Sequence, residues 1–421
     1  MGVYEVLVGC CQRLLASFLF PQFTSSTPIM GSESYACTVA VKPGTVPDDA
    51  KAHHVKTKAG RPVLFGNPFP SYGWKGVSLL RAAFIFARYR LQGKLPVPDA
   101  SDAKIPHVSP TFLPSRTKTD TLRATWIGHA TCFVEFPSGF RALFDPVFEE
   151  KFNAASPRRF TPPACKPGDF PALDAVFISH DHHDHLSLPT VKELAHLYPR
   201  VHFFCGLNRA AWFREAGITA VTEMDWWDDA HVVLENPNKT TTDRPQDASG
   251  CDGPESISVR VSCLPSQHGC MRSPFDKDSA LWASWAVSSG GKSVWFAGDT
   301  GYRNVPEGID ELGPGFDELP RNPQFTQIGQ LRGPFDVGLI PIGAYHPRMM
   351  YSPVHASPLD AVEIFLDTRC QKAIGIHWGT WALTSEPVAE PPEKLKEALK
   401  AKGLPQAGLF DVCAIGESRI F

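Results

Sequence analysis

Residues 178–187 read Ile-Ser-His-Asp-His-His-Asp-His-Leu-Ser, and this stretch indicates both the fold and the chemistry. It overlaps the end of the apolar run Ala175 to Ser179, which predicts a buried β-strand. The polar residues therefore fall on a turn at the carboxyl end of that strand, where α/β proteins assemble their sites. Four histidines stand within six positions, so one short loop offers two sets of ligands pointing in different directions.

Imidazole nitrogen and carboxylate oxygen suit zinc or a similar divalent ion, and such a ligand set leaves coordination positions for water and substrate. A solvated polar turn is the alternative explanation. It accounts poorly for four histidines directly after a buried strand. The pattern His-x-His-x-Asp-His, spanning His180 to His185, therefore predicts a metal site.

Two metal ions need more ligands than this loop supplies, and three isolated residues downstream stand in the same context. His268 follows the predicted strand that ends at Cys263, while Asp299 and His377 follow the apolar runs SVWFA and AIGI. Each residue alone would more often be structural. Their shared position, just past an apolar strand, favours one common site.

This ordered set of histidines and aspartates resembles the metallo-β-lactamase superfamily. The resemblance implies an α/β fold, the αββα sandwich of two mixed β-sheets flanked by helices, with a dinuclear site along one edge. The sequence itself predicts that strands dominate the early part of the domain, that helices alternate with the later strands, and that no repeat is present. The expected strands are 122–126, 130–136, 142–145, 175–179, 258–263, 282–288, 293–297 and 337–342, and the expected helix is 190–198.

More specific motifs resemble the family of phospholipases D that hydrolyse N-acylphosphatidylethanolamine. The resemblance runs from about Gly66 to Glu393. The motifs that carry it are WIGHAT (126–131), DWW (225–227), PSQH (265–268), GDTGY (298–302), IGAY (342–345) and HWGT (377–380).

Carried over residue by residue, the resemblance implies a site with two Zn²⁺ ions. His180, His182 and His268 would hold one zinc, Asp184, His185 and His377 would hold the other, and Asp299 would bridge both. The implied reaction is in-line attack of a metal-bridging hydroxide on the phosphorus of N-acylphosphatidylethanolamine, which yields N-acylethanolamine and phosphatidic acid.

The resemblance also assigns roles beyond the metal ligands. Asp184 would orient the nucleophile, and His355 would bind the phosphate or protonate the leaving oxygen. Tyr345, His355 and Trp378 are the candidate substrate-binding residues. His129 is interpreted as a structural residue or a support for the ligands, with direct contact to the substrate as the alternative. Asp145 is interpreted as a residue that orients a ligand histidine or fixes a turn.

The rest of the chain divides around this site. Residues 1–60 are expected to form an N-terminal extension, residues 61–120 an arm, residues 121–421 the catalytic domain, and residues 236–256 a mobile insertion within it. The apolar stretch 3–20 is a plain extension or a peripheral anchor, with Cys10 and Cys11 open to acylation. Residues 74–91 predict a basic amphipathic helix that either packs on the core or touches an anionic membrane.

Composition narrows the classes of function. The 421 residues are 43% hydrophobic with a formal net charge of −3, which excludes a disordered tail and a strongly basic nucleic-acid binder. The 11 cysteines form no CxxC pair, which is typical of reduced thiols in an intracellular protein. The partners expected are thus an N-acylated phospholipid and, through peripheral association on the cytoplasmic side, a membrane surface. A homodimer is a further expected partner, since members of this family form dimers.

Two other functions compete with the phospholipase. One is a soluble hydrolase of the same fold that acts on a thioester, a lactone or another phosphodiester. The other is a degenerate scaffold without activity, which the sequence disfavours because all seven ligand positions are filled.

Overall fold

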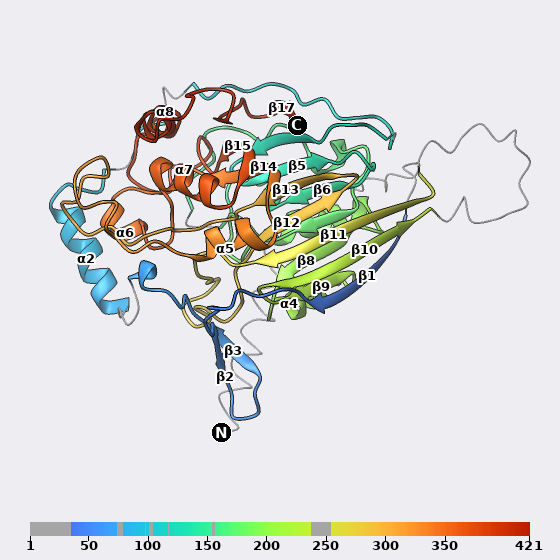
Figure 1. The fold of residues 1–421 in the computed structure, drawn as a ribbon, viewed down its shortest axis with the longest axis horizontal. Helices are drawn as coiled ribbons and strands as arrows, with labels where there is room; N and C mark the ends of the chain where they lie inside the picture. Colours follow the sequence, from blue (N-terminus) through green and yellow to red (C-terminus); the bar gives the residue numbers. More distant parts are fainter. Residues whose placement is uncertain are drawn as a thin grey trace, which may run out of the picture.

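The protein consists of two large mixed β-sheets packed face to face (Figure 1). The computed structural model describes residues 35–73, 79–96, 98–100, 104–116, 118–153, 156–236 and 254–421. A short hairpin, β2 (His54–Lys56) and β3 (Pro62–Phe65), projects from one end of the sandwich.

The first sheet has eight strands. In spatial order they are β1 (Ala36–Pro43), β10 (Asp228–Glu235), β11 (Ser256–Leu264), β12 (Ser284–Ser289), β13 (Lys292–Phe296), β14 (Phe335–Pro341), β15 (Cys370–Ile376) and β16 (Phe410–Asp411). Pairing is antiparallel from β1 to β13 and parallel from β13 to β16.

The second sheet has seven strands. In spatial order they are β17 (Ser418–Ile420), β4 (Arg123–Gly128), β5 (Thr131–Glu135), β6 (Arg141–Phe144), β7 (Ala175–Phe177), β8 (His202–Gly206) and β9 (Val221–Met224). In this sheet too, neighbouring strands pair antiparallel from β17 to β6 and parallel from β6 to β9.

Successive side chains along a strand point to opposite faces of the sheet, so the buried apolar residues form two layers. In β7, Ala175 and Phe177 belong to the apolar cluster between the sheets, whereas Val176 belongs to a second cluster on the outer face. Aromatic rings from the two sheets contact each other in the core: the ring centroids of Phe177 in β7 and Trp285 in β12 lie 5.6 Å apart. Because β7 is buried on both faces, its sequence is uniformly apolar, and its carboxyl end is held firmly in place.

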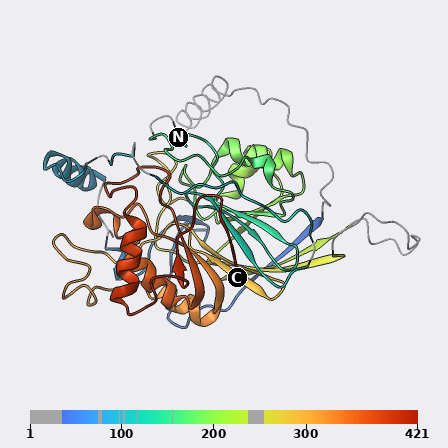
Figure 2. The ribbon, with the colours of Figure 1, turned by 90° about the horizontal axis from the view of Figure 1, so that it is seen from above.

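Helices cover both outer faces. Apolar residues of α3 (Leu188–Leu197) and α4 (Ala210–Glu215) pack on the seven-stranded sheet. The eight-stranded sheet is covered by α5 (Gln324–Leu331) and α7 (Pro358–Asp367), with α8 (Pro391–Ala401) packed against α7. Figure 2 shows α3 and α4 in green on one side of the sandwich and α7 and α8 in orange to red on the other. The predicted αββα sandwich of two mixed sheets is confirmed.

The strands predicted from the sequence are present, with ends shifted by at most two residues. The predicted helix 190–198 is α3, which begins two residues earlier at Leu188. Its start is fixed by Ser187, whose side chain accepts a hydrogen bond from the Thr190 backbone N–H, and by the proline that follows Leu188.

The predicted boundary of the N-terminal extension is wrong for residues 36–60. Residues 36–43 form β1, which pairs with β10 along its whole length, and the division at residue 61 falls within the β2–β3 hairpin. Strand β1 is an edge strand with mostly exposed side chains, and Cys37, Val39 and Val41 alternate along it in a strand pattern that the prediction overlooked. The sheets therefore use residues that the sequence assigned to an extension.

The arm contains the helix predicted from residues 74–91, observed as α2 (Leu79–Leu91). From the end of α2 to residue 120, the described residues form neither a helix nor a strand, apart from one β-bridge at His107. The apolar stretch 3–20, with Cys10 and Cys11, and most of the predicted insertion 236–256 lie outside the described residues. Among the described helices, none has the length and apolar character needed to cross a bilayer.

Candidate metal centre

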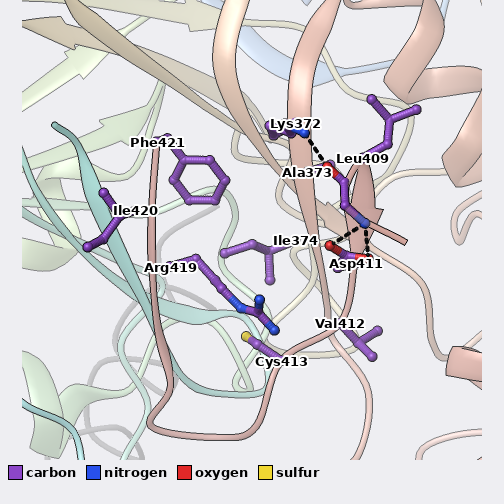
Figure 3. A pocket seen from close by; sticks show the side chains of 11 residues that line it. Lys372, Ala373, Ile374, Leu409, Asp411, Val412, Cys413, Arg419, Ile420 and Phe421 are labelled. Atoms are coloured by element: carbon purple, nitrogen blue, oxygen red, sulfur yellow. Dashed lines mark hydrogen bonds between the residues drawn. The ribbon is translucent and has the colours of Figure 1, made fainter. Parts of the chain in front are cut away.

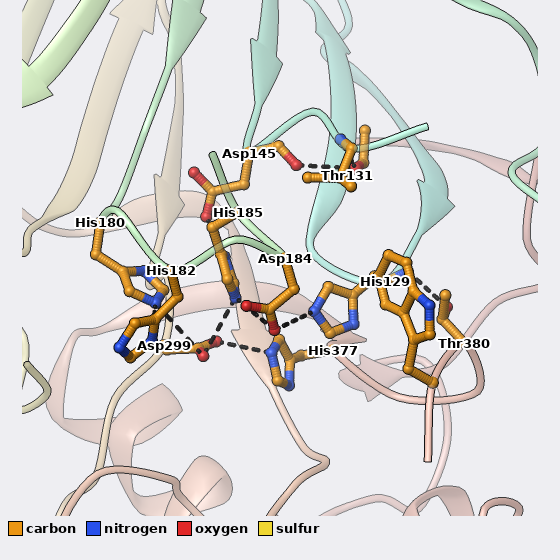
Figure 4. Close-up of polar contacts among 12 residues, drawn as sticks. His129, Thr131, Asp145, His180, His182, Asp184, His185, Asp299, His377 and Thr380 are labelled. Atoms are coloured by element: carbon orange, nitrogen blue, oxygen red, sulfur yellow. Dashed lines mark hydrogen bonds and ion pairs between the residues drawn. The ribbon is translucent and has the colours of Figure 1, made fainter. Parts of the chain in front are cut away.

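The predicted ligands gather at one edge of the sandwich because each of them follows a strand that ends there. The loop 180–185 follows β7 of one sheet, while His268, Asp299 and His377 follow β11, β13 and β15 of the other. Figure 4 shows the side chains from the β7 loop facing Asp299 and His377 from across the sandwich. Both sheets thus contribute to a single cluster.

Three imidazole rings form the first group of this cluster. His180 Nε2 lies 2.9 Å from His182 Nδ1, and His268 Nε2 lies 3.2 Å from the same atom. Three ring nitrogens that converge in this way match the arrangement by which histidines bind a divalent cation.

Asp299 lies between the first group and a second group of ligands. Its Oδ2 is 3.9 Å from His180 Nε2 and 3.2 Å from His185 Nε2, and its Oδ1 is 3.0 Å from His377 Nε2. In the second group, Asp184 Oδ2 lies 3.7 Å from His185 Nε2. One carboxylate therefore reaches both groups, as a residue shared by two ions must.

Neighbouring groups fix the rings of the candidate ligands. Asp145 Oδ2 accepts a hydrogen bond of 2.7 Å from His185 Nδ1, in agreement with its predicted role, and a hydrogen bond of 2.5 Å from Ser179 Oγ. His268 Nδ1 donates to the Val354 carbonyl at 2.9 Å. These contacts leave the Nε2 atoms of His185 and His268 facing the cluster, as they would in a metal site.

The buried polar atoms at the centre fit a bound cation. Three buried atoms make no well-oriented hydrogen bond with any described residue, namely His185 Nε2, Asp299 Oδ1 and His377 Nε2. Both ring nitrogens nevertheless lie within ion-pair distance of the Asp299 carboxylate, His185 Nε2 near Oδ2 and His377 Nε2 near Oδ1. Orphaned buried polar atoms are costly, and a metal ion would satisfy all three at once. The residues present therefore suit a pair of divalent ions.

Electrostatics favour the same interpretation. Burial lowers the pKa of His180 and His268 well below the usual value, so both rings are neutral and offer lone pairs. Burial alone would raise the pKa of Asp299, but the neighbouring His185 and His377 outweigh it and hold that pKa far below the usual range. Burial lowers the pKa of His185 too, but the carboxylates of Asp299 and Asp184 outweigh it and raise that pKa well above the usual value. The first group thus presents the neutral rings of His180 and His268, and Asp299 presents an ionised carboxylate.

Strained backbone marks the loops that carry the ligands. His377 has a φ of 63° and Asp145 a φ of 39°, values that residues with side chains rarely adopt. Gly298, directly before Asp299, has a φ of 59°, and a Cβ there would lie 2.5 Å from Ser179 Cβ. Glycine at position 298 therefore lets the β13 and β7 loops approach each other.

The structure also places the other predicted site residues. His355 joins the cluster, with its Nδ1 3.9 Å from Asp299 Oδ2. The Tyr345 hydroxyl instead donates to Glu390 at 2.5 Å, and the buried Trp378 ring stacks on Trp126 with its N–H directed to the Gly375 carbonyl. Trp378 also lines a small cavity of about 20 Å³ that adjoins His377.

His129 contacts the candidate ligand Asp184, in agreement with its predicted role as a support for the ligands. Its Nε2 is 3.2 Å from Asp184 Oδ2, its ring packs 4.1 Å from that of His377, and burial lowers its pKa to about 3. Ser179 and the Val354 carbonyl also support the ligands, and neither was predicted from the sequence. Ser179 could have been found from its place between the strand and His180, whereas a backbone carbonyl carries no sequence signal.

A larger cavity lies elsewhere, between the C-terminal strands of the two sheets (Figure 3). Its volume is about 230 Å³, and Ile374, Leu409 and Phe421 provide apolar walls beside the charged Lys372 and Arg419. It includes none of the predicted ligands, so it is separate from the candidate metal centre.

Comparisons with known proteins agree with this geometry. Residues 141–378 match the family model described as the beta-lactamase superfamily domain, a range that covers more than half of the chain and contains all seven predicted ligands. The chain is 36% identical to N-acyl-phosphatidylethanolamine-hydrolyzing phospholipase D 1 of Caenorhabditis elegans, over 67% of this chain and 70% of that protein.

Two further similarities are more distant. The mitochondrial N-acyl-phosphatidylethanolamine-hydrolyzing phospholipase D of Saccharomyces cerevisiae is 26% identical over 65% of this chain and 50% of its own length. A metallo hydrolase from the archaeon Ignicoccus hospitalis has a solved structure that matches 72% of this chain and 98% of its own, with a TM-score of 0.43 and 18% identity.

Proposed function

The chain belongs to the N-acylphosphatidylethanolamine-hydrolysing phospholipase D family within the β-lactamase superfamily, and we propose that it hydrolyses N-acylphosphatidylethanolamine with two zinc ions. Its family and fold are those of a metal-dependent hydrolase. The proposal adds the metal, the substrate and the role of each residue.

The position of Asp299 carries this proposal. One carboxylate lies within 3.9 Å of ring nitrogens in both groups of the cluster, which supports two ions that share a ligand. His180, His182 and His268 would hold the first zinc, and Asp184, His185 and His377 the second. Nitrogen and carboxylate ligands without thiolates suit zinc in a hydrolytic site that keeps positions open for water and substrate.

The reaction breaks the bond between phosphorus and the ethanolamine oxygen and forms a bond from phosphorus to a water oxygen. When bound, the two ions would lower the pKa of a water and polarise the phosphoryl oxygen. Asp184 orients that water, and His129 holds Asp184 in turn through the contact at 3.2 Å. The leaving oxygen takes a proton, so that the products are N-acylethanolamine and phosphatidic acid.

His355 is proposed to contact the phosphate. Its side chain is 15% exposed, and its Nδ1 is buried without a hydrogen bond to any described residue while lying 3.9 Å from Asp299 Oδ2. Replacing His355 with alanine should lower kcat/KM about 100-fold and leave the metal content unchanged, because the lost group would act on substrate. Steady-state kinetics and metal analysis check this, with His231→Ala as a control for an exposed histidine. A fall in bound metal would instead make His355 a support of the centre.

Helix α2 is proposed to dock on the membrane that supplies the lipid. Phe84 and Leu91 are 69% and 89% exposed, and Arg88 and Arg90 are exposed on the same helix. Tyr89 donates from its hydroxyl to Met349 Sδ in α6 (Arg348–Tyr351), the short helix that precedes His355, so α2 lies beside the site. Charge reversal at Arg88 and Arg90 should weaken binding to anionic vesicles several-fold. Equal sedimentation of both proteins with such vesicles would contradict this role.

The lipid assay tests the main proposal. Zinc-loaded protein is given N-acylphosphatidylethanolamine in mixed micelles, and mass spectrometry should find phosphatidic acid and N-acylethanolamine in equal amounts. Parallel reactions with a soluble thioester, a lactone and a simple phosphodiester test the alternative hydrolase. Intact lipid together with rapid turnover of a soluble substrate would reject the phospholipase assignment.

Three further predictions are untested. They are that Tyr345 and Trp378 bind the substrate, that the protein associates with the cytoplasmic side of a membrane, and that it forms a homodimer. Light scattering after size-exclusion chromatography measures the oligomeric state directly. A mass of one chain at micromolar concentration would contradict the homodimer.

A further inference from the structure

A second cluster of metal-binding side chains lies outside the candidate metal centre. It contains His53, His54 and Asp225, whose ligand atoms all lie within 4.8 Å of one another. His53 and His54 stand at the start of the β2–β3 hairpin, and Asp225 opens the turn between β9 and β10. Their side chains are 12%, 16% and 27% exposed, so the cluster is largely withdrawn from solvent.

Three nitrogens converge on the Asp225 carboxylate. Asp225 Oδ1 lies 2.9 Å from His53 Nε2 and 3.2 Å from His54 Nε2, and it also accepts a hydrogen bond of 2.8 Å from the Trp226 backbone N–H. His54 Nε2 also lies 3.0 Å from the second carboxylate oxygen, Oδ2. The same positions suit two imidazole lone pairs and one carboxylate oxygen around a cation, with the backbone N–H fixing the carboxylate.

The spacing supports a metal ion as well. Ligand atoms around a tetrahedral zinc lie about 3.3 Å apart, given bonds of about 2.0–2.1 Å. The separations here, 2.9 to 3.2 Å, equal those among the ring nitrogens of His180, His182 and His268. The two clusters are thus compact to the same degree.

Rigid neighbours hold the cluster in place. The His53 ring stacks on Trp226 with centroids 4.2 Å apart, and the Asp225 backbone N–H donates to Asp228 Oδ2 at 2.9 Å. Asp228 adds a second negative charge nearby, which favours a dication. A cavity of about 270 Å³, lined by both histidines and by Trp226, leaves room for a water or another ligand on the ion.

We propose that His53, His54 and Asp225 form a third metal site, which binds a divalent transition-metal ion such as zinc and joins the hairpin to the β9–β10 turn. The hairpin leads to Asn67, whose side-chain amide donates to the His268 carbonyl at 2.6 Å. From the other side, Trp226 Nε1 donates to the Trp282 carbonyl, and Trp282 Nε1 donates to the Ser266 carbonyl. The hairpin and the β9–β10 turn thus both support the loop that carries His268, and an ion at this site would join them.

Metal counting tests this site. The full chain is stripped with a chelator, dialysed to equilibrium against low micromolar zinc and analysed by mass spectrometry for bound metal. Wild-type protein and the His231→Ala control should each bind one zinc ion per chain more than His53→Ala/His54→Ala and Asp225→Asn do. Equal zinc content in the wild-type protein and in these two variants would overturn the proposal.

X-ray diffraction from the wild-type protein tests the same site without any variant, so it applies even if a variant does not fold. Crystals of wild-type protein prepared with zinc should show an anomalous peak among His53, His54 and Asp225 at the zinc absorption edge. Peaks confined to the centre around Asp299 would refute the third site and leave the dinuclear centre intact. Hydrolysis of lipid plays no part in either readout, so the outcome does not depend on the proposed function.

Discussion

Replacing Asp299 with alanine is expected to lower the kcat for N-acylphosphatidylethanolamine by a factor of about 1000 or more. Asp299 is 3% exposed, and its carboxylate reaches both groups of candidate ligands. Without its carboxylate, His185 and His377 lose their shared anionic partner, and two cations would face each other without a bridging charge. Zinc bound at this centre should therefore fall from two ions per chain to one or none, as measured by mass spectrometry after dialysis.

The control for this variant is Asp317→Ala, which removes a carboxylate that is 68% exposed and pairs with Arg321 and Lys402 at the surface. Exposed pairs of this kind contribute about 0–1 kcal/mol, so the control should keep its zinc and its activity. Full metal content in Asp299→Ala together with near-normal turnover would rule out the shared carboxylate as the basis of the centre.

The candidate site could be predicted largely from the sequence, because its residues obey a local rule. Each segment of the cluster begins within four residues of the end of a strand, and the last residues of each of these strands are buried. His268, Asp299 and His377 lie far apart in the chain, yet each was recognisable from the few residues before it. Their assignment to one zinc or the other rested on the family resemblance rather than on that rule.

Features that depend on contacts between distant segments could not be predicted in this way. Strand β1 pairs with β10, which lies far away in the chain. The alternation of Cys37, Val39 and Val41 was a local strand signal, but it gave no indication of the partner strand. The pair His53 and His54 becomes a cluster only because the hairpin brings it to Asp225, 171 residues away. The Asp225-Trp226-Trp227 motif was visible in the sequence, but its partner lay in a segment taken for an extension.

The loop that carries Asp299 continues into a buried ion network. Arg303 is fully buried, its Nε donates to Asp360 Oδ1 at 2.8 Å, and its guanidinium also pairs with Glu363, both acids being on α7. Arg348 of α6 donates to the other oxygen of Asp360. The network thus joins the Asp299 loop to α7 and to the short helix before His355.

Replacing Arg303 with alanine should therefore destabilise the protein by about 3–5 kcal/mol, because two buried carboxylates would lose a cation that cannot be replaced by water. The matched control is Arg321→Ala. Arg321 contacts the same Glu363 at 3.3 Å but is 45% exposed, so its removal should cost at most about 1 kcal/mol. Urea unfolding of the three proteins, followed by tryptophan fluorescence, measures the difference. If the two variants unfold at the same urea concentration, the Arg303 network does not anchor the Asp299 loop.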